Sequence, residues 1–293
     1  MKIVVTGSES FVGKELIFHC KAKDIYIKGL DLINKKESDY DFHQVDINSS
    51  KITDYIPENA DAVIHLAALS RDADCKGKAY ECFETNVMGT LNLIKACKAK
   101  NVRQFIFASS EWVYGEFNKD EIKDENTFID IAHLTSEYAL SKAVSESNLR
   151  QQYNQGFCPI TILRFGIIYG PRKNNWSAVE SIFDAVKNKP EVVIGSLKNG
   201  RRFVHVSDIA RGIIMSIGLK GFNIINLTNN KIITLQEIIE TSKSILNKSV
   251  KVTESDPTKI SIRNPSNNKA KKLLNWEPQI DLESGLKTIL PFV

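Results

Sequence analysis

The sequence has little of what marks several large classes of protein. Its 293 residues contain no apolar run that approaches the ~20 residues of a membrane-spanning helix. Neither sign of charge dominates, because 39 basic residues are set against 35 acidic ones for a net charge of +4. We therefore expect neither a membrane nor a nucleic acid as a partner. With 42% apolar and 25% charged residues, the composition is that of a globular chain that forms its own core.

Cysteine is scarce, and its spacing does not suggest a metal site. The chain has an odd number of cysteines and no C-x-x-C pair; the five are Cys20, Cys75, Cys82, Cys97 and Cys158. Free thiols of this kind are typical of a reduced, cytoplasmic protein, and we expect no metal ligands. Cys82 and Cys97 fall in a predicted helix, where we expect them to be core residues. The first seven residues are too short in their apolar part for a signal peptide and predict a strand.

The first half of the chain alternates short apolar runs with stretches of helical spacing. The runs that predict strands are Lys2–Thr6, Ile25–Leu30, Phe42–Val45, Ala62–Leu66, Gln104–Ala108 and Ile160–Arg164. The predicted helices are Phe11–Lys21, Ala79–Lys100 and Thr135–Tyr153. Continuously apolar strands separated by helices indicate a parallel sheet covered on both faces. The predicted fold class is therefore α/β, with a doubly wound parallel sheet.

The character of the sequence changes after Pro171, where Asn, Lys and short mixed segments dominate. Predicted helices here are Trp176–Asn188, Ser207–Leu219, Thr234–Leu246 and Asn268–Leu274. We divide the chain into a first domain, 1–170, and a smaller C-terminal α/β lobe, 171–293. Part of 206–227 is expected to return to the first domain.

A glycine-containing turn joins the first predicted strand to the first predicted helix. Thr6 to Gly13 reads TGSESFVG. Gly7 and Gly13 permit a tight turn and a close approach to a pyrophosphate, and the helix N-terminus supplies amides and a positive dipole end. Ser10 stands where the middle glycine of such a loop is usual. An ordinary strand–turn–helix junction is the alternative interpretation.

Asp31 follows the loop by about 20 residues, at the end of the second predicted strand. A carboxylate at this point accepts hydrogen bonds from the adenosine ribose hydroxyls and repels a 2′-phosphate, which favours NAD over NADP. Lys35 and Lys36 follow closely, so NADP stays open as an alternative. A surface turn residue is the other interpretation of Asp31.

Tyr138 and Lys142 form a Tyr-x-x-x-Lys pair within a predicted helix. Residues four apart lie on one helical face. A neighbouring ammonium and a positively charged nicotinamide favour the phenolate, so the pair can act as a general acid and base during hydride transfer. Tyr169 and Lys173 have the same spacing, but Pro171 lies between them, so that stretch is not a helix interior.

Ser109 and Ser110 follow the predicted strand that ends at Ala108. The carboxyl ends of parallel strands are where open α/β sheets bind their ligands. Ser110 could therefore hydrogen-bond a reacting oxygen and hold it near Tyr138. A helix cap or turn serine is the simpler alternative.

Together these motifs resemble the extended short-chain dehydrogenase/reductases, specifically the NAD-dependent epimerase/dehydratase family that acts on nucleotide sugars. The resemblance covers nearly the whole chain, and its order and spacing are specific. The matching stretches are Thr6–Gly13, His65–Ala68, Asn86–Thr90, Ser109–Gly115, Tyr138–Lys142 with Glu146, Leu163–Phe165, Tyr169–Pro171, Arg201–Ala210 and Leu274–Pro278.

The resemblance implies a Rossmann-type NAD-binding domain, a C-terminal lobe for a nucleotide sugar, and a homodimer formed through the two long helices. The sequence alone equally allows a monomer with both helices packed on the sheet. It implies Ser110, Tyr138 and Lys142 as catalytic residues. The residues it assigns to the cofactor are Gly7, Ser10, Phe11, Val12, Gly13, Asp31, Asp46, Ile47, Leu66, Ala67, Ala68, Asn86, Ser109, Tyr138, Lys142 and Phe165. Those it assigns to the substrate are Ser110, Glu111, Trp112 and Arg201, the arginine being suited to a diphosphate.

The chain also departs from the family pattern. Ser10 replaces a glycine, Ile167 replaces an asparagine that contacts substrate in many relatives, and no arginine lies near Asp256, although Arg263 could substitute. Sugar 4,6-dehydratases carry an Asp-Glu pair after the catalytic serine or threonine. Here the pair is Glu111-Trp112, and the loss of one acid disfavours dehydration.

We therefore expect an NAD-dependent epimerase that acts on a nucleotide sugar, with hydride transfer at C4 through a keto intermediate. A keto-sugar reductase or a sugar-nucleotide dehydrogenase uses the same motifs and stays open. A non-catalytic NAD-binding protein on the same fold is the alternative from another class.

Overall fold

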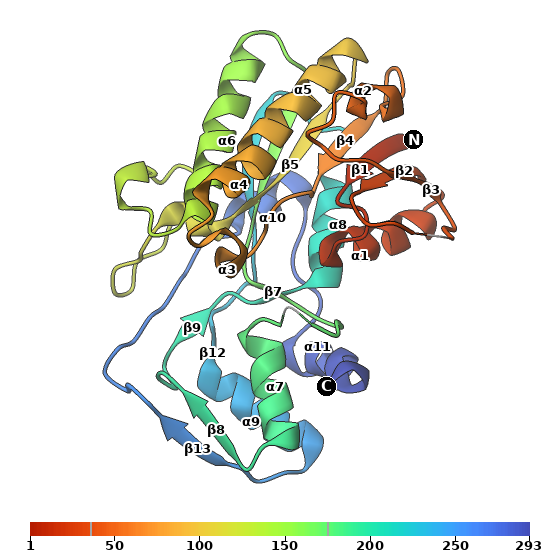
Figure 1. Cartoon of the computed structure of the whole chain (residues 1–293). Coiled ribbons are helices and arrows are strands. Elements are labelled where there is room, and N and C mark those ends of the chain that lie inside the picture. The colour runs from red at the N-terminus through yellow and green to blue at the C-terminus, as the bar shows by residue number, and fades with distance from the viewer. Residues whose placement is uncertain (36, 175) are drawn as a thin grey trace. The chain divides into compact units, whose positions relative to one another are not determined.

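The computed structural model describes residues 1–35, 37–174 and 176–293. Its central feature is a seven-stranded sheet with the strand order β3-β2-β1-β4-β5-β6-β11 (Figure 1). The strands are β1 (Lys2–Thr6), β2 (Tyr26–Asp31), β3 (Asp41–Gln44), β4 (Ala62–His65), β5 (Phe105–Ser110), β6 (Ile160–Phe165) and β11 (Phe222–Leu227). The pairings of β1 with β2 and β4, of β2 with β3, and of β4 with β5 are parallel. The order reverses beside β1, which is where a doubly wound sheet opens a ligand crevice.

The chain separates into two compact units. Unit 1 comprises 1–115, 127–164 and 210–225, and unit 2 comprises 116–126, 165–209 and 226–293. The helices of unit 1 are α1 (Phe11–Lys21), α2 (Ile52–Tyr55), α3 (Asp72–Cys75), α4 (Ala79–Phe83), α5 (Gly89–Ala99) and α6 (Glu137–Asn154), and α8 (Val206–Met215) belongs partly to each unit.

The core of unit 1 follows from the apolar strands. Ile3, Val4 and Val5 are consecutive in β1 and all fully buried, which requires cover on both faces of the sheet. On the face of α2, α5 and α6, strand side chains such as Val63 and Phe105 pack with Leu93 and Leu149 of the helices. Cys82 and Cys97 are buried, as predicted.

The predicted helix over 79–100 is not one regular α-helix. α4 and α5 are joined by a π-helical turn at Glu84–Met88, and such turns occur often at functional sites. The turn contains the buried Asn86, which the family resemblance assigns to the cofactor site. The predicted strand over 104–108 begins one residue later and continues through Ser110.

Unit 2 has its own apolar core under α7, α9 and α11. Its elements are β7 (Ile168–Tyr169), α7 (Ala178–Asn188), β8 (Glu191–Ile194), β9 (Gly200–Arg201), β10 (Val204–His205), β12 (Ile233–Thr234), α9 (Leu235–Leu246), β13 (Lys251–Glu254), α10 (Asn268–Leu274) and α11 (Leu282–Ile289). α7 and α9 both begin with a capping box, Ser177 with Glu180 and Thr234 with Glu237. The sequence pattern did not predict α11.

Candidate active site

The loop after β1 has the close backbone packing that a dinucleotide-binding turn requires. Gly7 has φ +71°, and a Cβ there would lie 2.6 Å from the backbone nitrogen of Ala67. A Cβ on Gly13 would lie 2.3 Å from the Gly7 carbonyl oxygen. Neither position can therefore hold a larger residue in this conformation.

Ser10 has a local role that the sequence did not reveal. It is the N-cap of α1, and its Oγ accepts a hydrogen bond from the Gly13 amide at 3.0 Å. Phe11 and Val12 open the helix behind it. The replacement of glycine thus keeps the helix N-terminus ordered, and the loop geometry fits a pyrophosphate there.

Asp31 lies beside this loop. It is the last residue of β2, and its carboxylate accepts hydrogen bonds from the Glu9 amide at 2.8 Å and from the Ile33 amide at 3.1 Å. At the end of the next strand the Asp46 carboxylate accepts from the Asn48 amide at 2.8 Å, and Ile47 is buried. Asp31 thus ends β2, and Asp46 and Ile47 follow the end of β3, the neighbour of β2 in the sheet.

The segment Leu66–Ala68 follows β4 and is held from both sides. The Leu66 amide donates to the Thr6 carbonyl at 3.0 Å. His65 lies between the hydroxyls of Thr6 and Thr90, at 2.7 and 2.9 Å, and burial lowers the pKa of His65 to about 3. The imidazole is therefore a neutral structural link between β1, β4 and α5.

Asn86 connects the segment after β4 to α6. Its side chain accepts from the Leu69 amide at 2.8 Å and donates to the Leu69 carbonyl and the Ser141 Oγ, each at 3.0 Å. Ser141 lies between Tyr138 and Lys142 on α6, so the amide of Asn86 positions the helix that carries them.

Tertiary structure brings Ser110, Tyr138 and Lys142 together. Ser110 ends β5, and Tyr138 and Lys142 lie on α6, which begins at the N-cap Ser136. The Lys142 ammonium donates to the Ala108 carbonyl at 2.8 Å and lies 5.9 Å from the centre of the Tyr138 ring. Tyr138 packs with Cys75 and Cys82.

Burial sets the acidity of this cluster in the absence of ligands. Burial raises the pKa of Tyr138 to about 12, although a hydrogen bond from Ser110 acts to lower it. Burial lowers the pKa of Lys142 to about 8, against the opposing effects of the Cys82, Glu146 and Cys75 side chains. A positive charge brought near the phenol would lower the Tyr138 pKa toward the working range of a general base.

Lys142→Met is expected to remove a pH dependence of stability. A free lysine has a pKa of ~10.4, so between pH 8 and that value the unfolded chain binds a proton that the folded protein has released. The free energy of unfolding of the native protein should therefore rise with pH across this window, relative to the variant. Denaturant unfolding of both proteins between pH 7 and 10.5 measures the difference, and parallel curves would contradict it.

Glu111 and Trp112 form a short 3-10 turn after Ser110. Glu111 is buried, and Trp112 packs against the cluster of Cys75, Cys82 and Tyr138. The position that holds the second acid in dehydratases is therefore occupied by an apolar ring packed beside Tyr138.

A buried ion pair contacts Ser109, the neighbour of Ser110 in the chain. The Arg164 guanidinium, at the end of β6, donates to both carboxylate oxygens of Glu146, at 3.0 and 2.6 Å. Glu146 also accepts from the Ser109 hydroxyl at 2.5 Å, and Arg164 lies 4.8 Å from the Tyr114 ring. From the sequence both charged residues were only motif matches without a role; the structure shows that they join β5, β6 and α6.

Arg201 and Phe165 belong to unit 2. Phe165 is buried. The Arg201 guanidinium donates to the carbonyls of Gly200 and Ser261 and to the Ser261 hydroxyl, which holds segment 261 against β9. Arg263 is buried, with its guanidinium 4.9 Å from the Phe117 ring. The diphosphate role of Arg201 stays a prediction.

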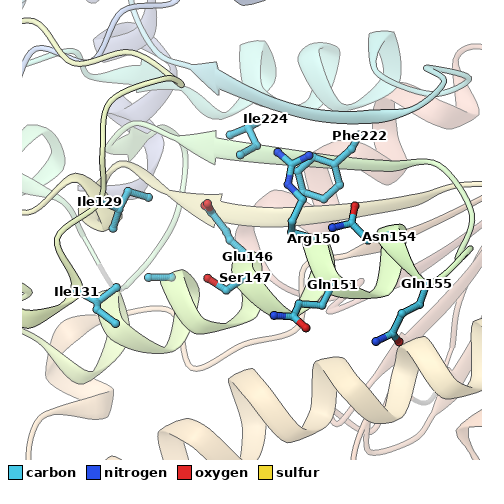
Figure 2. Close-up of a pocket in the computed structure, with 11 residues that line it drawn as sticks. Ile129, Ile131, Glu146, Ser147, Arg150, Gln151, Asn154, Gln155, Phe222 and Ile224 are labelled. Atoms are coloured by element: carbon cyan, nitrogen blue, oxygen red, sulfur yellow. The ribbon is translucent and has the colours of Figure 1, made fainter.

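A separate groove of about 620 Å³ runs along α6 in unit 1 (Figure 2). Its polar wall includes Ser147, Arg150 and Asn154, and Phe222 and Ile224 of β11 form part of the apolar wall. Figure 2 shows the Glu146 side chain on α6 between Ile129 and Arg150. None of Ser110, Tyr138 and Lys142 lines it.

Among the described residues, which omit 36 and 175, no group of three or more His, Cys, Asp or Glu side chains could hold a metal ion. No helix among them is both long enough and apolar enough to span a membrane.

The chain is similar in sequence and structure to several known proteins. A family model described as "NAD dependent epimerase/dehydratase family" matches residues 3–227. A UDP-glucuronate 4-epimerase of Thermodesulfobacterium geofontis is 28% identical over 97% of this chain and 93% of its own. A Bacillus subtilis protein described as an uncharacterized UDP-glucose epimerase, YtcB, is 29% identical over 100% of this chain and 98% of its own. The solved UDP-glucuronic acid 4-epimerase of Bacillus cereus, in complex with UDP-glucuronic acid and NAD, has a TM-score of 0.83 and 26% identity, covering 100% of this chain and 98% of that one.

Proposed function

Because the chain belongs to the NAD-dependent epimerase/dehydratase family, we propose that it is an NAD-dependent epimerase of a UDP-activated sugar, acting at C4. Membership of the family confirms the predictions of an enzyme of this family and of NAD dependence. The seven-stranded sheet confirms the predicted fold class. The choice of epimerase over its neighbours in the family rests on relatives that are UDP-sugar 4-epimerases and on Trp112 in place of a second acid.

We further propose that unit 1 binds the cofactor and that unit 2 supplies the substrate lobe. In unit 1, Gly7 follows β1, Gly13 lies in the first turn of α1 and Asp31 ends β2, which is where a dinucleotide is expected. Arg201 in unit 2 remains our candidate for the diphosphate, with Glu111 and Trp112 of unit 1 for the sugar. The convergence of Ser110, Tyr138 and Lys142 on one short stretch of β5 and α6 is the observation that carries the proposal.

The proposed chemistry assigns one task to each of these side chains. When bound, the nicotinamide supplies hydride acceptance and return. Tyr138 takes the proton from the sugar hydroxyl and later gives it back. Ser110 hydrogen-bonds the same oxygen and orients it, while the Lys142 ammonium favours the phenolate of Tyr138. Inversion requires the sugar to present its other face before the proton and the hydride return.

The first experiment is to denature the freshly purified protein and quantify the released NAD and NADH. An epimerase regenerates its cofactor in every cycle and can keep it bound, so near-stoichiometric release is expected. UDP-glucuronic acid and UDP-glucose would then be tested for isomerisation without added cofactor. An empty site, with turnover only when cofactor is added and consumed, would instead support the keto-sugar reductase or the dehydrogenase. Binding of NAD without turnover of any sugar nucleotide would support the non-catalytic alternative.

We also propose a cytoplasmic homodimer with a role in carbohydrate biosynthesis. Tyr80 of α4 and Met88 of the π-helical turn are 75% and 58% exposed, which leaves apolar side chains available to a second copy on the predicted interface helices. All five cysteines are free thiols, in keeping with a reducing compartment. Light scattering of the purified protein would measure the oligomeric state.

A further inference from the structure

Two lysines after β2, Lys35 and Lys36, leave NADP open as an alternative to NAD in the sequence. A 2′-phosphate needs a positively charged partner, and Lys35 is close enough in sequence to Asp31 to supply one. Lys36 lies outside the described residues. The structure shows which partner Lys35 has, and this bears on the cofactor of the proposed epimerase.

Lys35 is held by an acidic residue of the phosphate loop. Its ammonium lies 2.8 Å from Glu9 Oε1 and 4.8 Å from the centre of the Tyr40 ring. The Tyr40 hydroxyl donates to the same Glu9 oxygen at 2.6 Å. The Glu9 and Lys35 side chains are 8% and 29% exposed, so the pair is partly buried and less screened by solvent than a fully exposed pair.

Glu9 also lies next to the carboxylate assigned to the ribose. Its backbone amide donates to Asp31 Oδ2 at 2.8 Å. The backbone of Glu9 therefore binds the Asp31 carboxylate, while the side chain of the same residue holds Lys35. Among the described residues, the charged side chains paired with the Glu9 carboxylate are Lys35 and the exposed Lys14, whose ammonium is 3.7 Å away.

Glu9 is ionised at neutral pH. Burial acts to raise its pKa, but hydrogen bonds from Lys35 and Tyr40, together with the charges of Lys35 and Lys14, outweigh burial and lower the pKa. The positive charge of Lys35 is therefore matched by a fixed negative charge before any cofactor arrives.

We propose that Glu9 is a specificity-determining residue that excludes NADP by holding Lys35 away from a 2′-phosphate. A 2′-phosphate brings up to two negative charges to a site that already holds the Asp31 carboxylate. With Lys35 neutralised by Glu9, that phosphate meets no free ammonium from this lysine. NAD presents only ribose hydroxyls there, and the Asp31 carboxylate can accept hydrogen bonds from them. The inference rests on the proposed cofactor site but not on the proposed epimerisation.

The test is a double-mutant cycle on cofactor binding. Dissociation constants for NAD and NADP would be measured by titration calorimetry, after bound nucleotide has been removed with charcoal, for the native protein, Glu9→Gln, Lys35→Met and the double variant. Glu9→Gln keeps an acceptor for Tyr40 but releases Lys35. We expect it to shift the ratio of the two constants toward NADP by about tenfold, the scale of one charged interaction.

The double variant decides the role of Lys35. We expect it to lose the gain seen in Glu9→Gln, because the released ammonium is what would bind the phosphate. Glu15→Gln on α1 is the matched control, since it removes the same charge from a residue paired with His19 outside the loop, and its ratio should equal the native one.

Two outcomes would overturn the proposal: a Glu9→Gln ratio within twofold of the native value, or a gain that persists without Lys35. Failure of the native protein to bind either cofactor would overturn the cofactor site itself. NAD binding with an unmoved ratio would overturn only the role of Glu9.

Discussion

Tyr138→Phe is expected to lower kcat by about 10²–10⁴-fold, the usual contribution of a positioned general acid and base. The substitution removes only the hydroxyl that would exchange a proton with the sugar. The ring keeps its packing against Cys75, Cys82, Leu69 and Trp112, so the fold and the binding of NAD should be preserved. Turnover of UDP-sugars and NAD affinity, measured on the same preparation, test both statements.

Tyr169→Phe is the matched control for this prediction. Tyr169 has the same spacing to Lys173 as Tyr138 has to Lys142, and it is also buried, but its hydroxyl donates only a long hydrogen bond, 3.4 Å, to the Asp281 carbonyl. It lies in β7 rather than in a helix. We expect this variant to keep nearly all of its activity. Near-normal turnover by Tyr138→Phe, or equal losses in the two variants, would contradict the catalytic assignment.

Arg164→Met is expected to lower the free energy of unfolding by about 3–5 kcal/mol. The substitution leaves the Glu146 carboxylate without its bidentate partner. The pair is deeply buried, with Glu146 6% exposed and Arg164 3% exposed. The penalty comes from the unpaired buried charge rather than from the loss of the attraction alone. Denaturant unfolding at neutral pH measures it. Activity should also fall, because Glu146 anchors Ser109, next to Ser110.

Arg103→Met provides the comparison on the surface of the same unit. Arg103 pairs with Asp61 at 2.9 Å, but the side chains are 63% and 31% exposed, so the loss should stay below about 1 kcal/mol. Replacing both buried partners, as Arg164→Met with Glu146→Leu, should recover much of the stability lost by the first change. Equal losses for Arg164→Met and Arg103→Met would show that burial of the pair is not what matters.

Much of the architecture and the chemistry could be predicted from local patterns. Continuous apolar runs indicated the strands, because a strand covered on both faces needs apolar side chains at successive positions. The spacing of Tyr138 and Lys142 placed them on one helical face, since a helix repeats every 3.6 residues. Pro171 correctly excluded the Tyr169 and Lys173 pair. Asp31 was located at a strand end by its distance from the glycine turn.

Partnerships between charged and polar groups could not be predicted this way, because they depend on distances in space rather than along the chain. Lys35 could as well have faced a phosphate; folding pairs it with Glu9, 26 residues earlier. Arg164 of β6 pairs with Glu146 of α6. Asn86 donates to Ser141, 55 residues away, from a π-helical turn that the hydrophobic periodicity of the sequence does not predict. A buried polar group must find its partner wherever the packed elements supply one, so these choices belong to the tertiary structure.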